Sequence, residues 1–147
     1  MNVKRSDEVV VLRLSLHGRL VGYLAGFSNG RNVLTFADAF SADAGRPTFS
    51  LITHPDFPHS ARLMAEPWAR NLRLHPVLSN LLPDGALREW LAQKLKVHVD
   101  TEFQMLSYLG ADLPGALAVE PMAPDVVPES VLGAHGKARA VALARVA

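Results

Sequence analysis

Residues 9–36, VVVLRLSLHGRLVGYLAGFSNGRNVLTF, contain the pattern that decides the fold of this chain. The stretch 9–16 is rich in valine and leucine, and its second half alternates between apolar and polar side chains. The alternation separates an apolar face from a polar one: Leu12, Leu14 and Leu16 against Arg13 and Ser15. A period of two residues is typical of a β-strand with one solvated face.

Two turn signals follow this first strand. Residues 17–19 (HGR) predict a turn, after which residues 20–27 form a second strand. The pair Asn29-Gly30 predicts a hairpin, because both residues tolerate positive φ. Residues 33–40 (VLTFADAF) then form a third strand. We therefore predict an antiparallel meander in the N-terminal third of the chain.

The middle of the chain predicts short elements. Residues 41–47 form a loop, and residues 48–53 (TFSLIT) form one more short strand. The stretch 54–77 contains four prolines, which exclude long regular structure there. Residues 61–72 leave room for a short helical or extended piece within it.

Two helices are expected next. Asp84 is a good N-cap for a helix over about 85–97, and Asp100 for a second helix that ends at Gly110. In the first helix we predict an inward face of Leu87, Trp90, Leu91 and Leu95, and an outward face of Arg88, Glu89, Gln93, Lys94 and Lys96. In the second helix we predict that Phe103, Leu106 and Leu109 point inward.

The C-terminal quarter changes in character. Residues 115–121 form a last strand that ends in proline, and a proline-rich stretch follows. We predict an α+β fold in which an antiparallel sheet, made of the meander and later strands, is packed with two helices and followed by an irregular tail. The domain spans residues 1–121, and residues 122–147 form a linker and tail.

Composition narrows the classes of function. The chain has 147 residues, of which 49% are hydrophobic and 20% charged, with a formal net charge of +1. These values are typical of one globular domain, and they predict little direct affinity for nucleic acid or for a membrane. The absence of cysteine excludes a disulfide framework and a thiolate nucleophile. Because Arg13 interrupts the first apolar run, we expect neither a signal peptide nor a membrane span. We therefore expect the protein to be cytoplasmic.

No pattern for catalysis or cofactor binding emerges. His54, Asp56 and His59 could suggest a metal site, but two prolines among them favour a rigid turn with solvated side chains. Gly136-Lys137 resembles the end of a phosphate-binding loop, but Val131 stands where a glycine is required and Ala138 where a serine or threonine is required. We expect no catalytic residue, no metal and no cofactor.

Four segments resemble the N-terminal region of HipA-type toxin–antitoxin kinases. They are LSLHGRLVGYLAG (14–26), TFSLIT (48–53), LSNLLPDGALREWLAQKL (78–95) and FQMLSYLGADLPGALAVEP (103–121), and together they cover about residues 9–121. The residues that match two family motifs are Asn80, Leu81, Leu82, Pro83, Asp84, Gly85, Arg88, Glu89, Gly110, Asp112 and Gly115. The second motif departs from the family at Leu113-Pro114. The resemblance implies that these residues hold the fold.

The tail adds a degenerate glycine-rich loop. Ser130, Gly133 and Lys137 match a kinase segment that covers nucleotide phosphates, whereas His135 replaces the usual glutamine. The catalytic and magnesium-binding aspartate segments that phosphoryl transfer needs are missing, so we expect no enzymatic activity of this chain alone.

The resemblance implies one of two roles. The chain is either a free-standing antitoxin, like the HipS-type component of three-part HipBST systems, or the N-terminal structural part of a longer HipA-type serine/threonine kinase. In the first role it binds a HipA-type (HipT-like) kinase core and inhibits it. In the second it supports the core and contacts a helix-turn-helix antitoxin in a DNA-bound complex.

The loop 54–77 is the expected partner-binding surface. The residues that we expect to contact a partner are Trp68, Pro67, Arg70 and Phe57. Proline-fixed loops lose little entropy on binding, and tryptophan is common at binding hot spots. The alternative is that Trp68 folds back onto the core.

Overall fold

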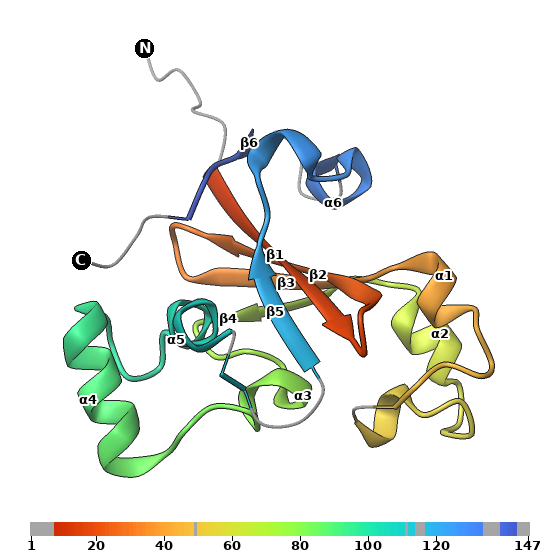
Figure 1. Cartoon of the computed structure of the whole chain (residues 1–147), viewed down its shortest axis with the longest axis horizontal. Helices are drawn as coiled ribbons and strands as arrows, with labels where there is room; N and C mark the ends of the chain where they lie inside the picture. The colour runs from red at the N-terminus through yellow and green to blue at the C-terminus, as the bar shows by residue number, and fades with distance from the viewer. Residues whose placement is uncertain (1–7, 49, 111, 114–116, 134–138, 144–147) are drawn as a thin grey trace.

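The computed structural model describes residues 8–48, 50–110, 112–113, 117–133 and 139–143. Six strands form one sheet: β1 (Glu8–Leu16), β2 (Arg19–Phe27), β3 (Arg31–Phe36), β4 (Trp68–Asn71), β5 (Leu117–Pro121) and β6 (Arg139–Ala140). Its main path runs β4-β3-β2-β1-β5 with antiparallel neighbours, and β6 pairs with β1 in parallel (Figure 1). The predicted antiparallel meander is confirmed.

Short helices connect and cover these strands. They are α1 (Asp38–Ser41), η1 (Leu51–Thr53), α2 (Ser60–Met64), α3 (Pro76–Ser79), α4 (Gly85–Leu95), α5 (Glu102–Leu109), η2 (Pro124–Val126) and α6 (Glu129–Gly133). In Figure 1 the helices α1 and α2 lie at one end of the sheet, α4 and α5 at the other, and α6 beside β6. The α+β class is confirmed, and none of the helices in the described ranges is both long and apolar enough to cross a bilayer.

A row of side chains across four strands organises the core. Leu12 pairs with Leu24, Leu24 with Leu34, and Leu34 with Trp68. The three leucines are buried, and they pack against helical residues such as Phe103. Because the row ends on the edge strand β4, its last member, Trp68, is only partly covered.

The tail covers part of the other face of the sheet, over β1 and β2. Val9, Val11 and Ala25 pack against Val127 and Val131, and all five are buried. The proline-rich stretch expected to be a linker therefore contributes two valines to a second small apolar cluster. Residues 122, 123, 127 and 128 lie outside helix and strand, as predicted for this stretch.

Two predicted strand segments are wrong. The third strand ends at Phe36 rather than at residue 40: the Ala37 N–H donates to the Val21 carbonyl, and α1 then turns Phe40 into the core. Residues 51–53 form the 3-10 helix η1 instead of a strand, because the Thr53 hydroxyl donates to the Ser50 carbonyl within the turn.

The predicted faces of α4 are wrong at three positions. Leu87 and Trp90 are 58% and 53% exposed, whereas Arg88 is buried. Leu91 is buried as predicted and Leu95 is partly buried. The inward face passes through positions 88, 91, 92 and 95, so the helix is rotated relative to the all-apolar stripe. The rotation follows from the ion pair that Arg88 makes inside the domain.

The predicted caps of α4 and α5 are only partly as the structure has them. Asp84 occupies the N-cap position of α4 without a side-chain capping bond, and the N-cap position of α5 is Thr101 rather than Asp100. Gly110 ends α5 as predicted, but at φ −50°. A Cβ atom at Gly110 would lie 2.4 Å from the Val119 carbonyl oxygen, so the close approach of β5 requires glycine here.

Candidate functional site

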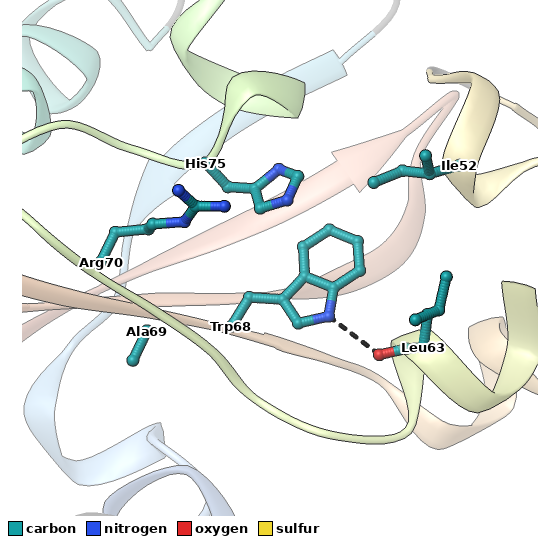
Figure 2. Close-up of a pocket in the computed structure, with 6 residues that line it drawn as sticks. All are labelled: Ile52, Leu63, Trp68, Ala69, Arg70 and His75. Atoms are coloured by element: carbon teal, nitrogen blue, oxygen red, sulfur yellow. Dashed lines mark hydrogen bonds between the residues drawn. The ribbon is translucent and has the colours of Figure 1, made fainter.

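Trp68 is held rigidly at the start of β4. The Phe36 ring packs against it in a T-shaped pair with centroids 4.8 Å apart, and the centroid of the His75 ring lies 4.4 Å from that of the indole. The indole N–H donates to the Leu63 carbonyl at 2.8 Å, as Figure 2 shows. Three independent contacts therefore fix the ring. Trp68 packs partly against the core and still borders the surface, and its contact with a partner stays a prediction.

A pocket of about 360 Å³ opens beside the indole, and we call it the Trp68 pocket. Its lining residues are Ile52, Leu63, Trp68, Ala69, Arg70 and His75. In Figure 2 Ile52 and Leu63 lie on one side of the indole, and Arg70 and His75 on the other. A second hollow of about 520 Å³ shares Leu63 and Trp68 and is further lined by His59, Arg62, Glu66 and Pro67. The arrangement offers an apolar cavity with a cation at its rim.

Arg70 supplies the charge of the pocket. Arg70 is exposed, and its side chain makes no hydrogen bond or ion pair with any residue that the structure describes. Burial lowers the pKa of His75, and the Arg70 charge lowers it further. The Val77 N–H donates to His75 Nδ1 at 3.2 Å, which also requires an unprotonated nitrogen at that position. The pocket therefore carries a stable positive charge at Arg70 and a neutral imidazole near neutral pH.

The buried Arg46 holds the opposite wall of the pocket in place. Its guanidinium donates to the carbonyls of Thr53, Ser41 and Asp43 at 2.8, 3.2 and 3.1 Å, and to the Ser60 hydroxyl at 2.7 Å. These bonds tie η1, which carries Ile52, to α2, which carries Leu63. A side chain with five donors satisfies several loop carbonyls at once, which is a role that lysine could not fill.

The structure brings together three of the four partner-binding residues expected from sequence. Trp68 and Arg70 line the Trp68 pocket, and Pro67 lines the adjoining hollow. Phe57 lies half-buried in the turn before α2 and lines neither. Sequence reasoning missed Ile52, Leu63 and His75, which come from separate elements, and no spacing in the sequence indicates them.

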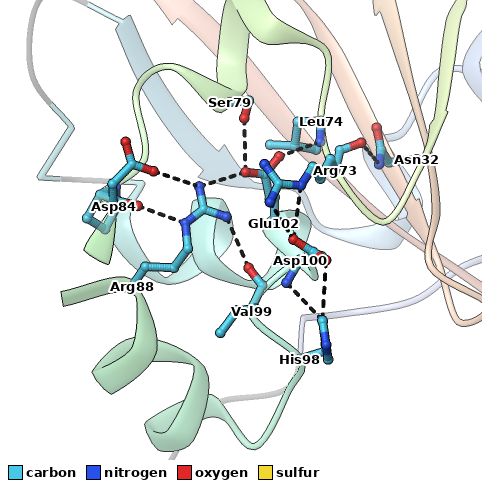
Figure 3. Close-up of polar contacts among 11 residues, drawn as sticks. Asn32, Arg73, Leu74, Ser79, Asp84, Arg88, His98, Val99, Asp100 and Glu102 are labelled. Carbon is cyan, nitrogen blue, oxygen red and sulfur yellow. Dashed lines mark hydrogen bonds and ion pairs between the residues drawn. The ribbon is translucent and has the colours of Figure 1, made fainter. Parts of the chain in front are cut away.

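The family-motif residue Arg88 forms a buried ion pair and lines neither hollow. Arg88 Nη2 lies 2.8 Å from Glu102 Oε2, and the Glu102 side chain is fully buried. Glu102 also accepts from the Leu74 N–H at 2.8 Å and from the Ser79 hydroxyl at 2.9 Å (Figure 3). The ion pair therefore connects α4 and α5 with the segment that includes α3.

Arg88 also donates hydrogen bonds to two loops. Nε donates to the Pro83 carbonyl at 2.9 Å and Nη1 to the Val99 carbonyl at 3.0 Å, while Asp84 lies 3.8 Å away. The arginine thus fixes the Pro-Asp-Gly turn before α4 and the loop after it. Its position inside the domain explains why a charged residue occupies an inward position of the helix.

The other motif residues have structural places. Leu82 is buried and Leu81 is partly buried against the core, and Asn80 follows α3. Gly85 begins α4 at φ +63°, and Glu89 on the same helix is exposed. The Asp112 N–H donates to the Leu109 carbonyl. Ser130 and Gly133 lie in α6, whereas Gly115 and Lys137 lie outside the described residues.

The histidine-rich turn forms no ligand cluster in the described part of the chain. No group of three or more His, Asp or Glu side chains there could hold a metal ion. His54 Nδ1 accepts from the Asp56 N–H at 3.0 Å, which closes the turn locally.

Comparison with known proteins identifies related sequences. Residues 12–120 match the family model described as the HipA N-terminal domain. A curated relative from Sinorhizobium fredii (strain NBRC 101917 / NGR234), named "Putative kinase Y4dM", is 38% identical over 121 residues. The aligned region covers 82% of this chain and 29% of the relative. The chain therefore spans less than a third of the curated relative that it matches.

Proposed function

Because this chain belongs to the family of HipA N-terminal domains, we propose that it is a non-catalytic interaction domain that binds the core of a HipA-type kinase and inhibits it. The observation that carries the proposal is the Trp68 pocket, a pre-formed apolar cavity beside a guanidinium that has no partner among the described residues. Arginine and tryptophan are enriched among the residues that dominate binding energy at protein interfaces.

Preorganisation favours this surface as a docking site. Phe36, His75 and the Leu63 carbonyl fix the indole before any partner arrives. Arg46 fixes the opposite wall in the same way. A partner therefore meets a surface whose side chains lose little conformational entropy on binding.

A second role is favoured by the length of the relative. This chain spans 29% of a protein named as a putative kinase. In that role the domain is the structural part of a longer kinase, and the same surface supports the kinase core within one chain. Such a domain contacts a helix-turn-helix antitoxin in a DNA-bound complex, where its net charge of +1 adds little affinity for DNA.

Co-expression tests the proposal. The chain is produced with a HipA-type kinase core that lacks this region, and growth rescue and co-purification are measured. We expect both with the wild type, and we expect Trp68→Ala and Arg70→Ala to weaken them. Trp90→Ala is the matched control, because Trp90 is a tryptophan exposed on α4, outside the Trp68 pocket.

The outcomes separate the two roles. Growth rescue with co-purification supports inhibition in trans. If the chain co-purifies with the core and raises its kinase activity or solubility, without rescuing growth, the structural role is supported. Failure of wild-type chain to bind the core refutes both, and equal binding by Trp68→Ala, Arg70→Ala and Trp90→Ala removes the Trp68 pocket from the interface.

A further inference from the structure

Along the outer edge of β4, some backbone groups have no hydrogen-bond partner among the described residues. The Leu72 N–H donates to the Gly30 carbonyl at 2.9 Å, and the register continues through Asn32 with Arg70. In an antiparallel ladder bonded pairs alternate with non-bonded pairs, so the N–H and C=O of Ala69 point away from β3. Ala69 is exposed, and in the described ranges nothing bonds to these two groups.

The opposite edge of the sheet is treated differently. The Met122 N–H donates to the Val11 carbonyl at 3.0 Å, so the same alternation points the Val119 N–H away from β1. That N–H donates to the Gly110 carbonyl at 3.3 Å. The fold thus satisfies the outward N–H of β5 with its own chain, whereas no described residue bonds to the outward N–H of β4.

Side chains beside the open edge specify what could pair with it. Trp68 and Arg70 lie two residues apart and therefore on one face of β4. A strand added at this edge would place one side chain opposite each of them, with Cβ atoms about 4.5–5.5 Å apart. The side chain opposite Trp68 reaches the apolar pocket. The side chain opposite Arg70 reaches a guanidinium that no described residue pairs with.

Charge favours an acidic partner segment. Arg62 and Arg70 line the two hollows beside the edge, and Glu66 is the one carboxylate among the residues that line them. The local balance is therefore positive, although the whole chain is close to neutral. A carboxylate binds arginine with paired, charge-assisted hydrogen bonds, which gives geometric specificity as well as attraction.

We propose, on the basis of the kinase-binding function argued above, that β4 receives an extended segment of the kinase core as an added strand. Its backbone pairs with Ala69, an apolar side chain enters the Trp68 pocket, and an aspartate or glutamate two residues away binds Arg70. Main-chain hydrogen bonds supply affinity in this mode of recognition, and alternate side chains supply specificity.

A charged residue on an edge strand can also serve only to prevent aggregation. A charge with that role needs no preformed pocket beside it and no partner of defined sequence. The substitution Ala69→Pro distinguishes this role from strand addition, because protection against aggregation would persist whereas binding of an added strand would be lost.

Ala69→Pro tests the added strand directly. Proline is tolerated on an edge strand where the N–H points outward, so the substitution removes the free donor and leaves the ladder with β3 intact. We expect affinity for the kinase core, measured by titration calorimetry, to fall about tenfold or more. Arg70→Glu should cause a similar loss, whereas Lys96→Glu, which carries the same charge change at the end of α4, should not.

Amide hydrogen exchange provides a second measurement that needs no substitution. Added kinase core should slow exchange at the Ala69 amide in the wild-type chain. If Ala69→Pro lowers the melting temperature, weaker binding by that variant could reflect unfolding, and exchange at Ala69 in the wild-type chain then tests the added strand.

Each outcome has one meaning. If the wild-type chain binds the core while Ala69→Pro and Arg70→Glu bind equally well and Ala69 stays unprotected, the added strand is refuted and the binding function stands. If the wild-type chain does not bind the core, the binding function fails and the added strand fails with it. Self-association of the chain alone that disappears in Ala69→Pro would overturn the proposal in favour of a second copy at this edge.

Discussion

Replacing Arg88 with methionine should destabilise the domain more than any loss of an exposed ion pair. The substitution keeps an unbranched side chain of similar length, which fills much of the same space. It removes the cationic partner of Glu102, whose side chain is fully buried. The Glu102 carboxylate keeps its bonds from the Leu74 N–H and the Ser79 hydroxyl, but the Pro83 and Val99 carbonyls lose their donor.

The magnitude follows from burial. Removing one member of a buried ion pair costs about 3–5 kcal/mol, because the remaining charge is left uncompensated in a poorly solvated site. For a chain of this length, 1 kcal/mol lowers the melting temperature by about 2–4 °C. We therefore expect the melting temperature to fall by about 6–20 °C, together with a lower urea midpoint.

Arg73→Met is the matched control. Arg73 lies 2.6 Å from Asp100 in a similarly short ion pair, but its side chain is 63% exposed. An exposed ion pair contributes about 0–1 kcal/mol, so this variant should lose at most a few degrees. Melting by circular dichroism and urea unfolding of both variants measure the difference.

A double substitution separates the pair from its desolvation. In Arg88→Met with Glu102→Met no buried charge is left unpaired, so the double variant should be more stable than the sum of the two single losses predicts. The reasoning is refuted if Arg88→Met costs no more than Arg73→Met, or if the two single losses simply add.

Three further predictions concern separate parts of the fold. Gly110→Ala should cost about 1–3 kcal/mol in urea unfolding, because the new Cβ would overlap the β5 backbone; unchanged stability would contradict the close approach. Burial and Arg70 lower the pKa of His75 in the folded chain, so its contribution to stability is complete above about pH 6.5 and is lost as the pH falls towards the folded pKa; His75→Asn should flatten the dependence of melting temperature on pH there. Leu91→Ala should cost about 2–5 kcal/mol and Trp90→Ala much less, since one side chain is buried and the other 53% exposed; equal losses would restore the inward position of Trp90.

Local patterns were sufficient where each residue acts mainly on its neighbours. Alternation over 9–16 and the Asn29-Gly30 turn predicted the meander, because strand faces and hairpin turns depend on adjacent residues. The prediction of a strand over 48–53 was wrong because its contacts are not periodic. The Thr53 hydroxyl donates to the Ser50 carbonyl, and the Thr53 carbonyl accepts from the Arg46 guanidinium; no period in the sequence indicates these bonds.

The candidate site shows the same division. The loop 54–77 predicted a partner-binding surface made of Phe57, Pro67, Trp68 and Arg70. The last three lie together and Phe57 does not, and binding of a partner stays a prediction. Ile52, Leu63 and His75 could not be predicted with them, because three separate turns of the chain bring them to Trp68.

The sequence by itself determined the family, the sheet order of the first three strands and the existence of two main helices, since these depend on motifs and on short periods. Tertiary structure alone decided which side of α4 faces inward. An apolar stripe predicts burial of Leu87 and Trp90, but the buried Glu102 on α5 needs a cation, and that need brings Arg88 inside and turns both apolar residues outward. A charge partner from another element outweighs the local pattern, because leaving a buried carboxylate unpaired costs more than exposing two apolar side chains.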